Sequence, residues 1–107
     1  MASFATDPNY FYMEPCVSHD GRRIFFLTTR PRAGQAARPG WANNSIWVAD
    51  RNTDGTWGEA YDLSAPINGD WLTYFPSITR GGTLYFTRAK ALGKDGAIYR
   101  SRLVEGR

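Results

Sequence analysis

The chain has 107 residues, which suits one compact domain with a modest hydrophobic core. Hydrophobic residues make up 42% of it and aromatic residues 15%, and this composition excludes an intrinsically disordered chain. Arginine supplies most of a net charge of +3, but the arginines are scattered from Arg22 to Arg107. The charge therefore does not favour a nucleic-acid binder, which normally gathers its basic residues on one face.

Cysteine content and hydropathy narrow the class further. The single cysteine, Cys16, excludes an intramolecular disulfide and a zinc site built from several cysteines. No segment approaches the roughly 18 consecutive apolar residues of a membrane-spanning helix. Residues 1–8 have neither the basic start nor the apolar stretch of a signal peptide. As written, the chain is expected in the cytoplasm, and in the periplasm or outside the cell if it belongs to a longer exported protein.

The first half of the chain consists of short apolar runs bounded by turn residues, without a sustained helical period. A strand is predicted at residues 12–18, then a turn at His19-Asp20-Gly21 and a strongly apolar strand at residues 23–29. Residues 30–44 contain two prolines and two glycines and predict a long loop. Further strands are predicted at Ser45–Asp50 and, after a turn at Asp54-Gly55, at residues 57–63.

The same order of elements returns in the second half. Strands are predicted at residues 73–79, 83–87 and 97–101, with a turn at Gly81-Gly82, so that the chain should form seven or eight antiparallel strands. The copies match in four places: residues 15–18 with 76–79, Gly21 with Gly82, residues 24–26 with 84–86, and residues 46–47 with 98–99. A repeat of about four strands with an aromatic residue on the same strand is typical of a β-propeller blade, which buries its two apolar faces against neighbours.

Over residues 12–103 the chain resembles the WD-repeat-like β-propeller repeats of the TolB type. The resemblance rests on the segments EPCVSHDGRRIFFLTTR, SIWVADRNTDGTWGEAYDLSAPIN and FPSITRGGTLYFTRAKALGKDGAIYRSRL. It implies an all-β fold of two four-stranded antiparallel blades, a partial propeller that oligomerisation would complete. Residues 12–66 would form the first blade, and residues 67–107 the second, which lacks its own outer strand. The second copy departs from the pattern, because Arg80-Gly81-Gly82 replaces the x-Asp-Gly of the repeat.

The N-terminal segment, residues 1–11, is expected to supply an outer closing strand. Its residues 3–8 weakly resemble the exit of the first outer strand at residues 61–66. Residues 3–7 should then lie next to residues 97–103, within one chain or between two chains. Two blades cannot close a ring, because propellers have about four to eight. The chain is therefore expected either to self-associate blade to blade, with a trimer favoured, or to be part of a larger protein.

No catalytic group can be assigned from the residue pattern. Ser18-His19-Asp20 contains the residue types of a catalytic triad, but contiguous residues on one turn cannot face one another as nucleophile, base and orienting acid. His19 is the only histidine. Cys16 lies on a predicted inner strand, where a small buried thiol is expected. The sequence therefore predicts no enzyme and no cofactor.

The segment Asp50-x-Asn52-x-Asp54-Gly55 matches the first half of a calcium-binding loop. Its twelfth position is Tyr61 and not the bidentate glutamate, so no metal site is predicted. Residues 53–57 nearly match the Asp-box of sialidase-like propellers but lack the spacer between aspartate and glycine. Sugar hydrolysis also needs a pair of acids in a pocket, and none can be assigned.

Candidate ligand-binding residues are aromatic side chains in loops or at strand entries, together with arginines beside them. Such groups could stack on a sugar or on a protein partner. They are Arg30, Trp41, Trp71, Tyr74 and Arg88. An alternative stays open, in which Trp71 and Tyr74 fill the joint between the blades.

Three functions are compatible with this pattern. The leading hypothesis is a non-enzymatic β-propeller repeat module that acts as a scaffold for a protein or a small ligand. The first alternative is a propeller fragment of a larger hydrolase or peptidase, and the second is a two-blade oligomeric lectin that binds sugar. Membrane association is not predicted.

Overall fold

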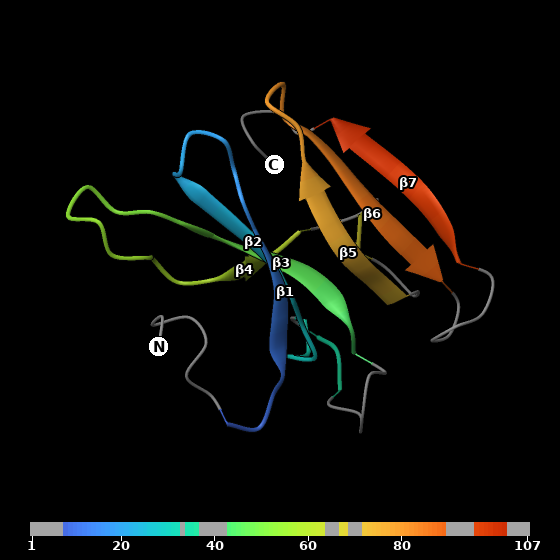
Figure 1. The fold of residues 1–107 in the computed structure, drawn as a ribbon. Coiled ribbons are helices and arrows are strands. Elements are labelled where there is room, and N and C mark those ends of the chain that lie inside the picture. Colours follow the sequence, from blue (N-terminus) through green and yellow to red (C-terminus); the bar gives the residue numbers. More distant parts are fainter. Residues whose placement is uncertain are drawn as a thin grey trace.

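A computed structural model describes residues 8–32, 34–36, 43–63, 67–68, 72–89 and 96–102. This part of the chain is all β, with seven strands and no helix (Figure 1). The strands form two antiparallel sheets, the first ordered β1-β2-β3-β4 and the second β5-β6-β7. The expected all-β antiparallel fold is thus confirmed. The bounds are β1 (Tyr12–Val17), β2 (Arg23–Thr28), β3 (Ser45–Asp50), β4 (Tyr61–Asp62), β5 (Leu72–Ile78), β6 (Thr83–Ala89) and β7 (Ala97–Arg102).

The strand predicted at residues 57–63 is wrong in its extent. β4 covers only Tyr61–Asp62, and Trp57 makes an isolated antiparallel bridge. The Gly58 amide donates a hydrogen bond of 2.8 Å to the Asp50 carbonyl, and a Cβ at Gly58 would lie 3.3 Å from the same oxygen. This close approach bends the chain after the turn, so regular pairing with β3 resumes only at β4.

Each sheet is formed by strands that are consecutive in the sequence. β1 to β4 fall within residues 12–66, and β5 to β7 fall within residues 67–107. The predicted placement of residues 3–7 beside the last strand lies outside the described residues.

Alternating side chains give the first sheet two apolar faces. Phe25 pairs with Val48 across β2 and β3, and Phe26 pairs with Trp47 one residue further along, so the two pairs point to opposite faces. Phe25 and Val48 belong to a buried cluster that includes residues of the second sheet. Phe26 and Trp47 form a separate buried cluster with Ala49 on the other face.

The joint between the sheets is made by the first of these clusters. β5 lies beside β1, β2 and β3, and its sheet continues away from the first (Figure 1). Burying one large apolar side chain contributes about 1.5–3 kcal/mol, so this cluster is the main apolar contribution that holds the sheets together. Its buried members among the described residues are Phe25, Ile46, Val48, Leu63, Ile67, Leu84 and Phe86.

A buried side-chain amide supplies the polar part of the joint. Asn68, which is 1% exposed, lies between the two sheets in the sequence. Its Nδ2 donates hydrogen bonds to the carbonyls of Ile46 (2.8 Å) and Leu63 (2.5 Å). Its Oδ1 accepts hydrogen bonds from the Ile46 amide (3.1 Å) and the Thr73 hydroxyl (2.7 Å). One side chain thus connects β3, the residue after β4, and β5.

The internal repeat of the sequence recurs in the strand register. Phe26 pairs with Trp47 in the first sheet, and Phe86 pairs with Tyr99 in the second, as the matched motifs require. Each sheet also begins with a strand that is interrupted by a bulge. The two sheets therefore repeat one another in pairing as well as in sequence.

A proline lies inside each bulge, Pro15 in β1 and Pro76 in β5. Proline has no amide hydrogen to donate to a neighbouring strand, so a bulge is one of the few places where a sheet accepts it. The preceding residues, Glu14 and Phe75, have positive φ angles of 54° and 55°. The Glu14 carboxylate accepts a hydrogen bond of 2.7 Å from the Phe75 amide and so ties the two bulges together.

We expect Phe26→Ala or Trp47→Ala to lower the free energy of unfolding by about 3–5 kcal/mol, because these side chains are only 2% and 5% exposed. Urea unfolding followed by circular dichroism measures this loss. Phe11→Ala is the control, since Phe11 is 55% exposed and should change stability by less than about 1 kcal/mol. A similarly small loss for Phe26→Ala would contradict the burial of its side chain.

We expect Asn68→Leu to destabilise the chain by at least about 3 kcal/mol, because it removes four hydrogen bonds and leaves buried backbone groups without partners. Thr73→Val removes only one of the four and should cost about 1–2 kcal/mol. The same urea titration ranks the two variants. Equal losses would show that the amide does not organise the joint.

Candidate functional site

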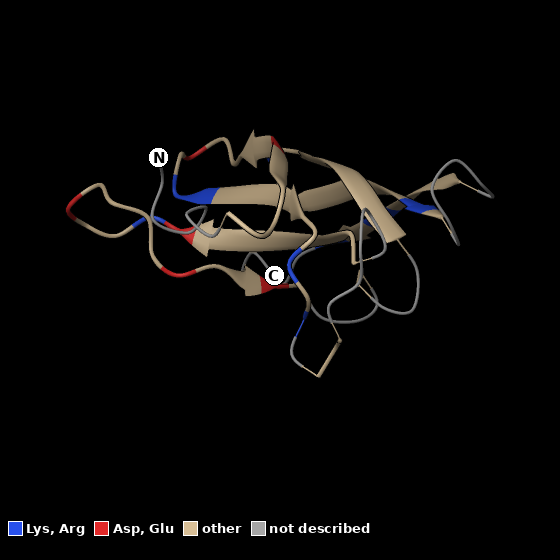
Figure 2. Ribbon diagram, turned by 90° about the horizontal axis from the view of Figure 1, so that it is seen from below, with Lys and Arg blue, Asp and Glu red and all other residues tan. Residues whose placement is uncertain are grey.

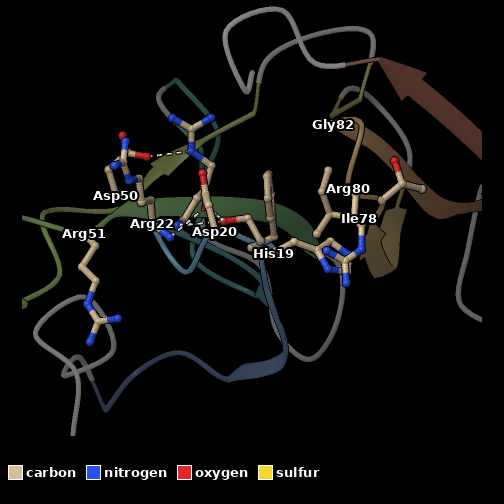
Figure 3. A pocket seen from close by; sticks show the side chains of 12 residues that line it. His19, Asp20, Arg22, Asp50, Arg51, Ile78, Arg80 and Gly82 are labelled. Atoms are coloured by element: carbon tan, nitrogen blue, oxygen red, sulfur yellow. Dashed lines mark hydrogen bonds and ion pairs between the residues drawn. The ribbon is translucent and has the colours of Figure 1, made fainter.

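A pocket of about 740 Å³ opens where the first hairpin turns of the two sheets lie side by side. Its walls are the turn between β1 and β2, the turn between β5 and β6, and the end of β3 (Figure 3). Buried Phe25 and half-buried Ile78 form its apolar part. Most of the other side chains around it are polar, and the charged or titratable ones labelled in Figure 3 are His19, Asp20, Arg22, Asp50, Arg51 and Arg80.

The first turn is fixed by its own hydrogen bonds. The Gly21 amide donates to the Ser18 carbonyl (2.9 Å), and Gly21 adopts a φ of 73° that suits glycine. The Ser18 hydroxyl accepts a hydrogen bond from the Arg23 amide (3.1 Å) and donates one to Asp20 (2.6 Å). The same Asp20 oxygen accepts a hydrogen bond from the Arg22 amide (3.0 Å).

These hydrogen bonds determine the charge of Asp20 and the direction in which the Ser18 hydroxyl donates. The Ser18 hydroxyl, and next the Arg22 amide, hold the pKa of Asp20 below its ordinary value of 3.8. Asp20 is therefore ionised at neutral pH. Because the Ser18 hydroxyl donates to Asp20 and not to His19, Ser18-His19-Asp20 does not form the relay of a catalytic triad.

The second turn is closed by an equivalent backbone hydrogen bond, but it has no negative charge. The Gly82 amide donates to the Thr79 carbonyl (3.1 Å), and Gly82 has a φ of 87°. Gly81 stands where the first turn has Asp20, so this turn contains no carboxylate. Among the residues that the structure describes, none forms an ion pair or a side-chain hydrogen bond with Arg80.

The third wall of the pocket contains a neutralised pair. Arg23 Nε donates a hydrogen bond of 2.7 Å to Asp50 Oδ1 across the end of the β2–β3 ladder. The Tyr61 hydroxyl donates to Asp50 Oδ2 (2.9 Å). Both carboxylate oxygens of Asp50 therefore have partners, and its charge is balanced by Arg23.

Arg51 lies beyond this pair and is held by its own hairpin. Its Nε donates to the Gly55 carbonyl (3.1 Å), and its guanidinium lies 5.3 Å from the centre of the Trp57 ring. In Figure 2 most charged residues of the first sheet lie at strand ends and in turns. Glu14, in the bulge of β1, is an exception, and its carboxylate accepts a hydrogen bond from the second sheet.

The two predicted ligand-binding arginines lie elsewhere and stack on aromatic rings of their own sheets. The Arg30 guanidinium is 4.6 Å from the centre of the Trp47 ring, and that of Arg88 is 4.4 Å from the centre of the Tyr99 ring. Neither residue lines the pocket. Cation–π stacking within a sheet gives these side chains a structural role, and their binding of a ligand stays a prediction.

The predicted aromatic ligand residues are only partly described. Tyr74 is half-buried on β5 and contacts Phe75 edge to face, with ring centroids 5.0 Å apart. Trp41 and Trp71 lie outside the described residues. Of the described members of the predicted set, Arg30, Tyr74 and Arg88, none lines the pocket. The alternative role of Trp71 and Tyr74 in the joint also stays a prediction, although the polar part of that joint is Asn68.

The segment that resembles half a calcium loop is a tight hairpin turn. Asp54 accepts hydrogen bonds from the Thr56 hydroxyl (2.6 Å) and the Thr56 amide (2.9 Å), and these lower its pKa in that order. Asn52 Nδ2 donates to the Thr56 hydroxyl (3.1 Å). Within the described ranges, no group of three or more His, Cys, Asp or Glu side chains could hold a metal ion.

Cys16 is partly exposed, contrary to the expected buried thiol. It packs on the edge of the cluster at the joint. Because β1 is the first strand of its sheet, it has a neighbour on one side only, and this leaves the thiol incompletely covered.

The candidate ligand residues predicted from the sequence do not include the pocket arginines Arg22 and Arg80. A usable signal did exist: the repeat places Arg80 at the position of His19, next to the glycine that replaces Asp20. Matching the two turns therefore predicts an excess of positive charge between them.

Comparison of the chain with protein-family models, with curated proteins and with solved structures finds no match. Among the described residues, no helix is long and apolar enough to cross a membrane.

We expect Ser18→Ala to raise the pKa of Asp20 toward 3.8, because it removes the strongest hydrogen bond to the carboxylate. Asp54 is the internal control, since its lowered pKa depends on Thr56 in another turn. Carbon-13 NMR titration of the carboxyl groups measures both values. An unchanged Asp20 midpoint in Ser18→Ala would contradict the assigned cause.

The sign of the associated stability effect follows from the direction of the shift. The folded-state pKa of Asp20 lies below its unfolded value, so the ionised carboxylate stabilises the folded turn above the unfolded pKa. That contribution is lost as the pH falls through the folded pKa, which lies below 3.8.

Proposed function

We propose that this chain is a non-enzymatic β-propeller repeat module that acts as a binding scaffold, with its second sheet made to receive a further sheet of the same kind. The observation that carries the proposal is a face of the second sheet on which two large apolar side chains, Tyr85 and Ile98, are exposed. The residues at the equivalent positions of the first sheet are buried at the joint between the sheets. In a repeat architecture each unit buries its faces against neighbours, so such a face marks a place for the next unit.

The register makes the equivalence specific. Phe25 and Ile46 on the first sheet are 1% and 0% exposed, because the second sheet covers them. By strand pairing, Tyr85 stands at the position of Phe25, and Ile98 at that of Ile46. Tyr85 is 37% exposed and Ile98 is 78% exposed. Large apolar side chains gathered on one exposed face are typical of an interface.

We propose that a second copy of this chain covers that face with its own first sheet. The side chains that cover Phe25 and Ile46 include Leu84 and Phe86, and the register equivalents of these on the first sheet are Ile24 and Phe26. The first sheet therefore presents, at Ile24 and Phe26, the kind of apolar side chains that cover Phe25 and Ile46 within one chain. A partner that covered the second sheet would need side chains of this kind. Within one chain Arg30 and Trp57 pack over that face, so the proposed contact requires both side chains to move. A head-to-tail contact of this kind closes into a ring or runs on as a filament, and we favour a ring of three chains.

Binding is favoured over catalysis by the state of the acids around the pocket. Asp50 is paired with Arg23 and accepts a hydrogen bond from Tyr61. Asp20 is engaged by Ser18, the hydroxyl that would otherwise be the candidate nucleophile of that turn. A hydrolytic mechanism that used these two acids would need one of them free to exchange a proton with substrate.

We expect light scattering to give the solution mass of an oligomer, three times 12.0 kDa for the favoured trimer. Ile98→Asp should dissociate it, because it places a charge at the centre of the proposed contact. Phe11→Asp is the matched control: Phe11 is also exposed but lies before β1, and this change should leave the mass unaltered. Circular dichroism checks that both variants fold. A monomeric wild-type chain at high micromolar concentration would overturn the proposal.

A further inference from the structure

We infer that the pocket between the two hairpin turns binds a small oxyanionic ligand, one that carries carboxylate or phosphate groups. This inference rests on the proposed binding function and names the class of ligand. It does not require the contact between chains, because all three walls of the pocket belong to one chain.

The charges that line the pocket do not cancel. Four arginines face it, Arg22, Arg23, Arg51 and Arg80, against the two aspartates Asp20 and Asp50. The Asp50 carboxylate forms an ion pair with Arg23. One carboxylate therefore remains to oppose three guanidinium groups, and the pocket is electropositive.

Arg80 is the strongest candidate to contact a ligand. It is exposed on the second turn, where Gly81 replaces the aspartate of the first turn. Within the described part of the chain no carboxylate is paired with it. Figure 3 shows it on the side of the pocket opposite Arg51. The second turn and the end of β3 thus place arginines on opposite sides of the pocket.

Arg22 adds a positive charge to the wall formed by the first turn, between β1 and β2. Its amide is used by Asp20, and its side chain is exposed on the first turn. The positive charge of Arg22 contributes, after the two hydrogen bonds, to the lowered pKa of Asp20. The Arg22 side chain lines the pocket, and among the described residues it forms no ion pair with Asp20.

The chemistry of the guanidinium group decides the class of ligand. Its planar array of donors matches the paired oxygens of carboxylate and phosphate groups, and such charge-assisted hydrogen bonds are the strong ones. Arginines on facing walls favour a ligand with more than one anionic oxygen. The volume of about 740 Å³ suits a small molecule, and the apolar part at Phe25 and Ile78 can contact its carbon skeleton.

The test is isothermal titration calorimetry of the wild-type chain with pyrophosphate, with citrate and with a neutral disaccharide, at about 0.15 M salt to screen long-range attraction. We expect saturable binding of at least one anion and none of the disaccharide. Arg80→Gln should weaken the anion about tenfold or more, as expected for the loss of a charge-assisted hydrogen bond. Arg32→Gln removes the same charge from a loop outside the pocket and should change affinity less than about twofold.

The outcomes separate the proposals. Tighter binding of pyrophosphate than of citrate would identify a phosphate ligand, and the reverse would identify a carboxylate ligand. Ile98→Asp leaves the pocket intact, so anion binding by this variant would support the site whatever happens to the oligomer. The inference is overturned if neither anion binds the wild-type chain, or if Arg80→Gln and Arg32→Gln weaken binding equally.

Discussion

The joint between the two sheets is the constraint on which the rest of the structure depends. An apolar cluster supplies most of its burial, but burial alone would leave backbone groups of β3 and the end of β4 without hydrogen-bond partners. Asn68 satisfies them with one side chain and also engages Thr73 on β5. A buried polar network of this kind fixes one relative placement of the sheets, which a purely apolar contact would leave less defined.

That placement sets the geometry of the pocket. The two turns that form its walls are each rigid through internal hydrogen bonds, but the space between them exists only because the sheets are held side by side. The Glu14–Phe75 hydrogen bond adds a second tie between the first strands. Substitutions at the joint should therefore affect the pocket even though none of the joint's polar residues reaches it.

The sequence predicted most of the fold because its local signals agree with one another. Apolar alternation placed six of the strands. The matched prolines Pro15 and Pro76 lie in bulges that recur in both sheets, but the bulges themselves were not predicted. The short β4 was mispredicted because the close approach of Gly58 to the Asp50 carbonyl depends on the third dimension. Asn68 was missed because its hydrogen-bond partners lie on strands of both sheets. Arg80 is a different case, because Gly81 replaces the aspartate in its own turn and matching the two turns shows this in the sequence.

The equivalence of the two sheets also limits the affinity of the proposed outer contact, in which the second sheet of one chain packs against the first sheet of another. By strand pairing, Arg100 stands at the position of Val48, which is fully buried at the inner joint. A sheet packed on this face would cover the aliphatic stem of Arg100 while its guanidinium reached the solvent or an acidic partner. Full burial of that charge without a partner would cost several kcal/mol. The outer contact must therefore be more polar than the inner joint, and for that reason weaker and dependent on concentration, while the inner joint holds within every chain.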